Sequence, residues 1–312
     1  MNNSTERKIV IVKRKTRLEE LIVRFNTVAQ AKFYIEHMGS DFSDYISEDE
    51  CYKKVLIKAQ SDLDRIGRIV VIDRGFLPNY LFGESDIVIA IGQDGMVANT
   101  LKYLNGQPLI GINPDPTRWD GVLLPFTVDD IRIIAQEVIK DKRAVKEVSM
   151  AKATLNDGQE LYAVNDLFIG QRTHVSSRYQ IKLGEKHESQ SSSGIIVSTG
   201  LGSTGWLKSI ISGSNNIMKQ LSGVRNEIRI DSQMPWDENK LYFAVREPFP
   251  SKISGTEIVF GKITKEVPLR ISSQMPENGV IFSDGIESDY LQFNSGIEAC
   301  ITVADKKGLL VV

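Results

Sequence analysis

Apolar runs and amphipathic segments alternate along the N-terminal part of the chain. Short runs rich in β-branched residues predict strands at residues 8–13, 68–73, 86–91 and 108–113. Apolar positions at helical spacing predict one long helix from Leu18 to Ala29, a second that opens at the capping box Ser47-Glu48-Asp49-Glu50 and ends before Gly67, and two more over residues 96–104 and 129–140. Strands that alternate with helices predict a parallel, right-handed α/β sheet.

The pattern changes to short strands from about Ala144 onward. We predict strands at residues 149–155, 161–169, 179–183, 194–198, 241–245, 256–260, 267–272, 280–283 and 300–304. Asn156-Asp157-Gly158 between the first two is a hairpin signal, and residues 189–193 are predicted as a short polar turn. We therefore expect an α/β domain over residues 1–143 and a β-rich, β-sandwich-like domain over residues 144–312.

Composition narrows the functional classes without naming one. The chain has 312 residues, of which 41% are hydrophobic and 25% charged, as in soluble globular proteins. A net charge of −2 predicts no bulk attraction to nucleic acid or to a membrane surface. No segment approaches the ~20 apolar residues of a membrane span. Two cysteines, Cys51 and Cys300, cannot build a disulfide framework or a zinc cluster, so we expect a cytoplasmic protein.

One glycine-rich turn follows a fully apolar strand. Gly92-Gln93-Asp94-Gly95 comes directly after the run ending at Ile91 and precedes a predicted helix. Glycines let backbone N–H groups approach an anion, and a helix N-terminus favours negative charge. Asp94 would repel a phosphate, so it suits a proton, a sugar hydroxyl or a metal ion. An Asp before a Gly is also a common turn pair, and the residues alone leave the two interpretations even.

A second turn repeats this logic in the C-terminal part. The strand at 194–198 runs into Thr199 to Trp206, which holds three glycines and three hydroxyl side chains before another helical pattern. These groups can donate hydrogen bonds to a polar ligand, and Trp206 offers a flat face to an aromatic base. A turn that binds nothing is the alternative. This alternative is weakened because the polar pair Asn165-Asp166 interrupts an otherwise apolar predicted strand.

Common nucleotide and hydrolase motifs do not account for the sequence. There is no P-loop lysine motif, and the glycines at 200, 202 and 205, although spaced as in G-x-G-x-x-G, lie in the C-terminal part, which is the wrong place for a Rossmann start. Ser203 lacks the G-x-S-x-G frame of a nucleophile elbow. The three histidines have no metal-ligand spacing, and we assign no protein side chain as a metal ligand.

Taken together, these segments resemble the NAD kinase family. The family's G-G-D-G turn, N-E or N-D pair, T-x-T-G-S-T-A-Y-like turn and late D-G appear in order as Gly92 to Gly95, Asn165-Asp166, Thr199 to Trp206 and Asp284-Gly285. The resemblance covers nearly the whole chain. It looks closest to the mitochondrial-type branch, judged by Lys15-Thr16-Arg17 and by the segments 111–118 and 165–170.

The resemblance implies an NAD kinase-like fold with an active site between its two domains. It implies transfer of the γ-phosphoryl group of ATP to the 2′-hydroxyl of the adenosine ribose of NAD, giving NADP. Mg²⁺ would accompany the ATP, and Mg²⁺ does much of the charge neutralisation in such reactions. The N-terminal domain would bind nucleotide and the C-terminal one NAD. A homodimer or homotetramer is expected, with no nucleic-acid or membrane partner.

Individual roles follow from matched positions. Asp94 is the expected catalytic residue, which accepts the proton of the ribose hydroxyl or orients that hydroxyl. The residues expected to bind NAD are Gly95, Asn165, Asp166, Thr204, Gly205 and Trp206. Those expected at the ATP phosphates are Gly92, Gln93, Lys15, Arg17, Thr199, Gly202 and Ser203, with Arg118 and Asp284 as further candidates. A solvated basic turn is the alternative for Lys15 and Arg17, and a simple β-turn for Asp284.

Several positions depart from the family pattern. Gln93 replaces a glycine, Met96 a threonine, Gly205 an alanine and Trp206 a tyrosine, and Ser193 stands where many members carry an acid. These departures leave open NAD against NADH as substrate and ATP against polyphosphate as donor. They also motivate two other hypotheses, a kinase of the same superfamily with a lipid or sugar acceptor and a catalytically weak NAD(P)-binding sensor.

Overall fold

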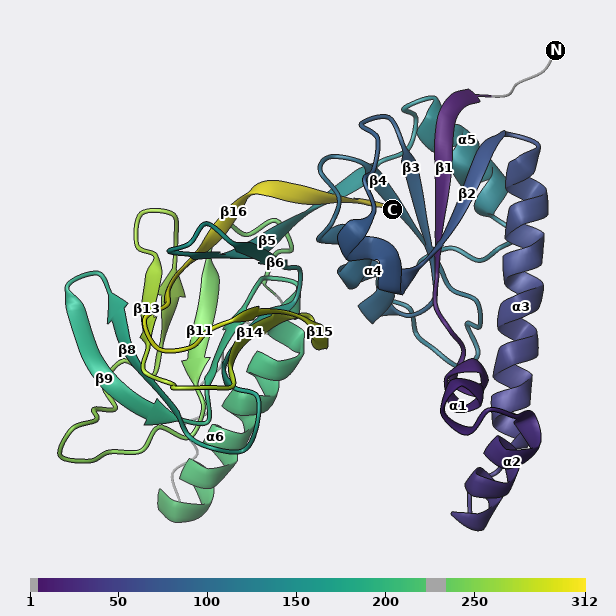
Figure 1. Ribbon diagram of the computed structural model, residues 1–312. Helices are drawn as coiled ribbons and strands as arrows, with labels where there is room; N and C mark the ends of the chain where they lie inside the picture. Colours follow the sequence, from purple (N-terminus) through teal and green to yellow (C-terminus); the bar gives the residue numbers. More distant parts are fainter. Residues whose placement is uncertain (1–4, 223–233) are drawn as a thin grey trace. The chain divides into compact units, whose positions relative to one another are not determined.

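The fold consists of two compact units. The computed structural model describes residues 5–222 and 234–312 (Figure 1). Unit 1 comprises residues 1–146 and 309–312, and unit 2 comprises residues 147–308. Within the described ranges, no helix is long and apolar enough to cross a membrane.

A parallel sheet forms the centre of unit 1. Its strands run in the order β2-β1-β3-β4, and the last residues of β16, Leu309 and Leu310, pair in parallel with β4. The strands are β1 (Thr5–Lys13), β2 (Gly67–Asp73), β3 (Ile87–Ile91), β4 (Pro108–Ile112) and β16 (Glu298–Val311). All five residues of β3 are buried, as expected for a central strand covered on both faces.

Helices cover the sheet of unit 1. Isoleucines of β1, β3 and β4 pack with Tyr52, Ala59 and Leu63 of α3 and with Ile131, Ile134 and Val138 of α5. The helix α4 packs against β3 and β4. The helical elements are α1 (Arg17–Phe25), α2 (Val28–His37), α3 (Ser43–Asp64), the 3₁₀ helix η1 (Arg74–Asn79), α4 (Asp94–Leu101) and α5 (Ile131–Ile139).

Two helix predictions for unit 1 were wrong in their limits. The expected single helix from Leu18 to Ala29 is broken, because Asn26 adopts a left-handed conformation with φ of 65° and the Thr27 side chain caps α2. The next helix starts at Ser43 instead of the capping box at Ser47, so that box lies inside α3. Short-range patterns place a helix well but its ends poorly.

Unit 2 is a pair of packed sheets. One has six antiparallel strands in the order β12-β11-β10-β7-β14-β15. The other contains β9, β8, β13 and β16 with β5 and β6. The remaining elements are β5 (Val145–Leu155), β6 (Glu160–Ala163), β7 (Asp166–Gln171), β8 (Ser177–Leu183), β9 (Lys186–Ser192), β10 (Ile195–Ser198), the 3₁₀ turn η2 (Gly202–Thr204), α6 (Trp206–Ser222), β11 (Leu241–Val245), β12 (Phe260–Ile263), β13 (Leu269–Ser273), β14 (Gly279–Ser283) and β15 (Ile286–Gln292).

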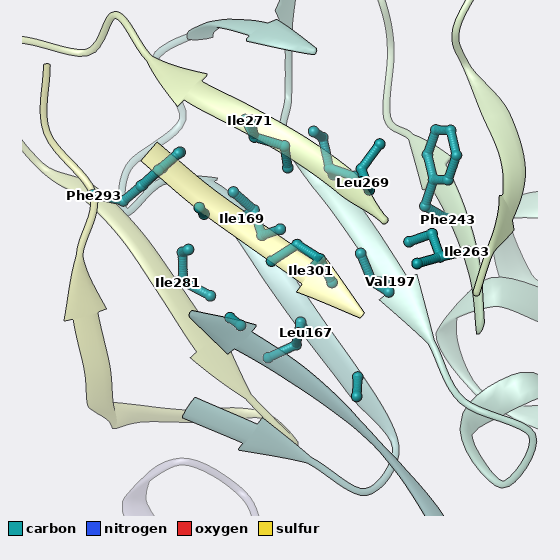
Figure 2. Packing of buried hydrophobic residues seen from close by; sticks show 14 of the residues in the cluster. Leu167, Ile169, Val197, Phe243, Ile263, Leu269, Ile271, Ile281, Phe293 and Ile301 are labelled. Atoms are coloured by element: carbon teal, nitrogen blue, oxygen red, sulfur yellow. The ribbon is translucent and has the colours of Figure 1, made fainter. Parts of the chain in front are cut away.

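Alternate residues of the two sheets form the core of unit 2. Leu167 and Ile169 of β7 lie among side chains of both sheets, including Val197, Ile271 and Ile301 (Figure 2). The fold-class prediction, an α/β part with a parallel sheet followed by a β-rich part, is confirmed by these two units.

Several strand predictions needed correction. The expected strand 161–169 is two strands, interrupted at Val164 and Asn165. The expected polar turn at 189–193 lies mostly in β9, whose inward side chains Gln190 and Ser192 are polar and hydrogen-bond the buried Tyr179 hydroxyl. The predicted strand 256–260 begins only at Phe260, and the sequence pattern missed β15.

Candidate functional site

The first glycine turn joins β3 to α4 as the sequence predicted. Gly92 is buried, and a Cβ there would lie 2.8 Å from the Met96 Sδ, so glycine allows Met96 to pack beneath the turn. Gln93 and Gly95 are exposed. Gln93 occupies the N-cap position of α4, but its side chain makes no capping hydrogen bond. The turn therefore presents backbone and the Gln93 side chain to solvent at a helix start.

Asp94 is half-buried and held in a fixed orientation. Its Oδ1 accepts a hydrogen bond of 2.7 Å from the Leu123 N–H, in the loop that follows β4. That loop is packed closely, since a Cβ on Gly111 would lie 2.2 Å from the Leu123 carbonyl oxygen. Among the described residues, Oδ2 of Asp94 has no hydrogen-bond partner. One carboxylate oxygen thus anchors the loop, and the other is available to a ligand.

Arg17 and Arg118, distant in sequence, meet at one carboxylate. Asp44 accepts from Arg17 Nη2 at 2.7 Å and from Arg118 Nη1 at 2.6 Å. Arg17 also pairs with Glu48, and Arg118 Nε lies 3.4 Å from Asp115. The exposed Lys15 lies two residues before Arg17. The candidate phosphate cations therefore gather in unit 1, two of them already paired with acids.

Sequence reasoning missed a buried arginine beside these groups. Arg14 Nη2 is 2.7 Å from Glu48, and the guanidinium lies over the rings of Tyr52 and Trp119, at 5.0 and 5.6 Å from their centroids. The Tyr52 hydroxyl accepts from the Arg14 N–H at 3.0 Å and donates to the Ile91 carbonyl at 2.8 Å, immediately before Gly92. Burial raises the pKa of Tyr52 to about 12. The only sequence signal for Arg14 was its place directly after β1.

In unit 2, the structure brings Asn165-Asp166 and Asp284 together. The Asp284 carboxylate accepts hydrogen bonds from the backbone N–H groups of Val164, Asn165 and Asp166, the shortest at 2.6 Å to Asn165. Asp284 has a φ of 54°, and its own N–H donates to the Asp166 carbonyl at 2.9 Å. Asp284 therefore fixes the interruption between β6 and β7 that carries the polar pair.

The second glycine turn packs directly on the same interruption. The buried Thr199 donates its hydroxyl to the Val164 carbonyl at 2.6 Å and accepts from the Gly202 N–H at 3.1 Å. A Cβ on Gly202 would lie 2.1 Å from the Asn165 carbonyl oxygen, so only glycine fits there. Ser203 bonds locally to the Gly200 carbonyl. Thr204, Gly205 and Trp206 are exposed, so the turn presents its end to solvent and buries its start.

Asp166 is a perturbed acid within this assembly. Its Oδ1 is buried and lacks a hydrogen-bond partner. Burial raises the pKa of Asp166 to about 7, the Ser198 hydroxyl offsets part of that shift, and the Asp284 charge adds to it. A buried, unpaired carboxyl oxygen is costly unless a ligand completes it, which marks Asp166 as a site candidate.

Trp206 forms one wall of a cavity of about 410 Å³. Its ring stacks on Phe168 with centroids 6.0 Å apart, and the Arg246 guanidinium lies 5.3 Å from its centroid. Ser193 in the cavity wall donates its hydroxyl to Glu247, a non-glycine residue with a φ of 48°. An aromatic wall beside the charged side chains of Arg246 and Glu247 suits a planar polar ligand.

Replacing Asp284 tests its structural part in this site. Asp284→Ala leaves three backbone N–H groups without their acceptor, and we expect it to lower the free energy of unfolding by about 2–4 kcal/mol. Asp284→Asn keeps one acceptor oxygen and tolerates positive φ, so a smaller loss is expected. Urea unfolding followed by circular dichroism measures both. An alanine variant as stable as wild type would contradict this assignment.

Comparisons with known proteins agree on one family name. The chain is 25% identical over 170 residues to NAD kinase 2 of Geobacillus kaustophilus, covering 53% of this chain and 60% of that protein. It is 31% identical over 128 residues to the NAD kinase of Chlorobium phaeobacteroides, covering 39% of this chain and 44% of that protein. The chain thus spans about half the length of the curated relatives it matches. No protein-family model matches it.

Solved structures share the fold over almost the whole chain. The yeast NADH kinase complexed with NADH has a TM-score of 0.59 and 14% identity, covering 99% of this chain and 84% of that one. An NAD kinase from Archaeoglobus fulgidus in complex with ATP has a TM-score of 0.56 and 13% identity, covering 98% and 93%. The predicted NAD kinase-like fold is therefore confirmed.

Proposed function

We propose that this chain is a member of the NAD kinase family and transfers the γ-phosphoryl group of ATP to the 2′-hydroxyl of the adenosine ribose of NAD. The observation that carries the proposal is the assembly of three motifs in unit 2. These motifs, Asn165-Asp166, the turn from Thr199 to Trp206, and Asp284, are distant in sequence. Hydrogen bonds nevertheless join Asn165 both to Asp284 and to Thr199 of the turn. The curated relatives that the chain matches are named NAD kinases, which supports the same reaction.

In this proposal unit 2 binds the adenosine part of NAD. The Asn165 amide can read an adenine edge, and the Asp166 carboxylate can accept from ribose hydroxyls. The buried, unpartnered Oδ1 of Asp166 is the atom that gains most from such a hydroxyl. The exposed end of the second turn, from Thr204 to Trp206, offers a donor, open backbone and an aromatic ring. Thr199 and Gly202 support this turn from within.

Asp94 is the proposed base for the ribose hydroxyl. Its Oδ1 is occupied by the Leu123 N–H, which leaves Oδ2 to accept the proton or orient the hydroxyl. A positioned general base contributes typically ~10²–10⁴-fold. The neighbouring Gly92, Gln93 and Gly95, with Lys15, Arg17 and Arg118, are proposed to face the phosphates of ATP.

Mg²⁺ fits this donor set only as a partner of the triphosphate. Within residues 5–222 and 234–312, no group of three or more His, Cys, Asp or Glu side chains is arranged to hold a metal ion. Mg²⁺ commonly keeps several waters and binds through substrate phosphates, so the triphosphate would supply its ligands and Oδ2 of Asp94 stays available to the ribose hydroxyl. When bound, Mg²⁺ neutralises charge on the phosphoryl group in transfer.

An assay of NADP formation tests the proposal. Purified protein with ATP, Mg²⁺ and either NAD or NADH is expected to produce the 2′-phosphorylated dinucleotide. Inorganic polyphosphate in place of ATP shows which donor is used. If no product forms from ATP or polyphosphate with either NAD or NADH, the proposed kinase activity is refuted. Tight NAD binding in calorimetry without product would favour a sensor. The observation that favours the sensor is the exposed Gln93 side chain, which stands where the family's turn has a glycine.

Two finer assignments belong to the same proposal. The segments 111–118 and 165–170 support a place near the mitochondrial-type branch. The family resemblance supports a homodimer or homotetramer, which light scattering of the purified protein measures directly.

A further inference from the structure

Three arginines of unit 1 are organised around three acids. We call this set the arginine network; its members are Arg14, Arg17, Arg118, Asp44, Glu48 and Asp115. The arginines come from the position directly after β1, the start of α1 and the loop after β4. Arginine binds carboxylate and phosphate oxygens with the same planar donor geometry. A network of this kind can therefore exchange one anion for another.

The two central acids differ in how they are held. Glu48 pairs with Arg14 and Arg17 and its side chain is 2% exposed, so it is a fixed part of the interior. Asp44, one turn earlier on α3, pairs with Arg17 and Arg118 and its side chain is 44% exposed. Arg17 and then Arg118 lower the pKa of Asp44, which keeps it charged at neutral pH. Asp44 is the acid that an incoming anion can replace.

The network borders the turn that carries Asp94. Tyr52 joins the Arg14 N–H to the Ile91 carbonyl, the last residue before Gly92. The loop holding Arg118 and Trp119 continues to Leu123, whose N–H bonds Asp94. An anion bound by the network would therefore lie beside the Gly92 turn.

One donor of the network is unused. Arg14 Nε is buried and has no hydrogen-bond partner among the described residues. The whole Arg14 side chain is only 9% exposed. A buried donor without an acceptor is unfavourable, and native structures rarely keep one without a reason. This donor indicates that a group outside the chain completes the network.

We propose that the arginine network binds the triphosphate group of a ligand and that Asp44 is its exchangeable counter-ion. Phosphate oxygens replace Asp44 on Arg17 and Arg118, while Glu48 keeps Arg14 and Arg17 in place. Asp44 therefore limits affinity for the ligand, because two ion pairs must be broken before binding. The inference rests on the proposed function only for naming the ligand as the phosphoryl donor.

Asp44→Asn tests the exchange directly. Calorimetry with magnesium ATP and with magnesium tripolyphosphate is expected to show binding tightened roughly 3- to 10-fold, because a competing charge in two partly exposed ion pairs is removed. The gain should shrink at about 0.5 M salt, where such charges are screened. Tightening toward ATP alone would identify a nucleotide ligand, and toward tripolyphosphate alone an inorganic one. Unchanged or weaker binding of both probes would overturn the proposal.

Two further variants control this result. Asp62→Asn removes the same charge from an ion pair with Lys58 on the same helix, about 27 Å along its axis, and should leave both affinities unchanged. Arg118→Gln is expected to weaken both affinities; unchanged binding would contradict the site. NADP formation is measured separately. If Asp44→Asn tightens binding but the wild type forms no NADP, the proposed kinase activity is refuted and the exchange at Asp44 stands. If the wild type forms NADP but Asp44→Asn leaves the affinity unchanged, the exchange is refuted and the kinase activity stands.

Discussion

Asp94→Asn is expected to lower the kcat for NADP formation by ~10²–10⁴-fold while changing the KM for NAD little. The asparagine keeps an oxygen for the Leu123 N–H, so the loop after β4 stays anchored. Its amide nitrogen cannot accept the proton of a ribose hydroxyl. The loss should therefore appear in the chemical step and leave binding and folding close to wild type.

Asp94→Ala separates the two tasks of this carboxylate. It removes both the acceptor for Leu123 and the proposed base, so kcat should fall as far as in the asparagine variant and the melting temperature should also fall. Steady-state kinetics and thermal unfolding of both variants measure the difference. An asparagine variant that keeps more than about a tenth of the wild-type kcat would remove Asp94 from the role of base.

Asp166→Asn is expected to make the protein more stable at pH 8 and less able to bind NAD. The folded pKa of Asp166 is about 7 against a usual value of 3.8, so the folded state holds its proton longer than the unfolded chain. Stability contributed by this proton is present at low pH and is lost as pH rises from about 4 to about 7. Three pKa units at 1.36 kcal/mol each set an upper limit of about 4 kcal/mol on the loss. The neutral amide avoids it.

The pH dependence of both properties identifies Asp166. Urea unfolding at pH 5 and pH 8 should show a stability difference between the variant and wild type at pH 8 that shrinks toward pH 5. Calorimetry should show wild-type affinity for NAD rising as pH passes about 7, and weak binding by the variant throughout. Glu185→Gln, at an exposed acid between β8 and β9, is the control and should change neither. Equal stabilities at pH 8 would contradict the buried-acid interpretation.

The sequence determined those features that depend on neighbouring residues. The continuous apolar run before Gly92 was correctly predicted as a buried strand, and two strand–glycine–helix transitions placed both turns correctly. Alternating strands and helices, followed by short strands, were sufficient for the fold class. The order of the motifs along the chain was sufficient to suggest the family, because it is a property of the sequence itself.

Only the tertiary structure decided which partners the polar residues of the site have and how deeply they are buried. Asp284 looked like a turn residue, but it fixes a backbone segment 120 residues away at Val164. Arg118 meets Asp44 across 74 positions, and the only sequence signal for Arg14 was its place directly after β1. The burial that perturbs Asp166 depends on what packs around it. Periodicity describes how a side chain faces within its own element, whereas partner and burial depend on where distant segments pack, and a local pattern carries no information about that.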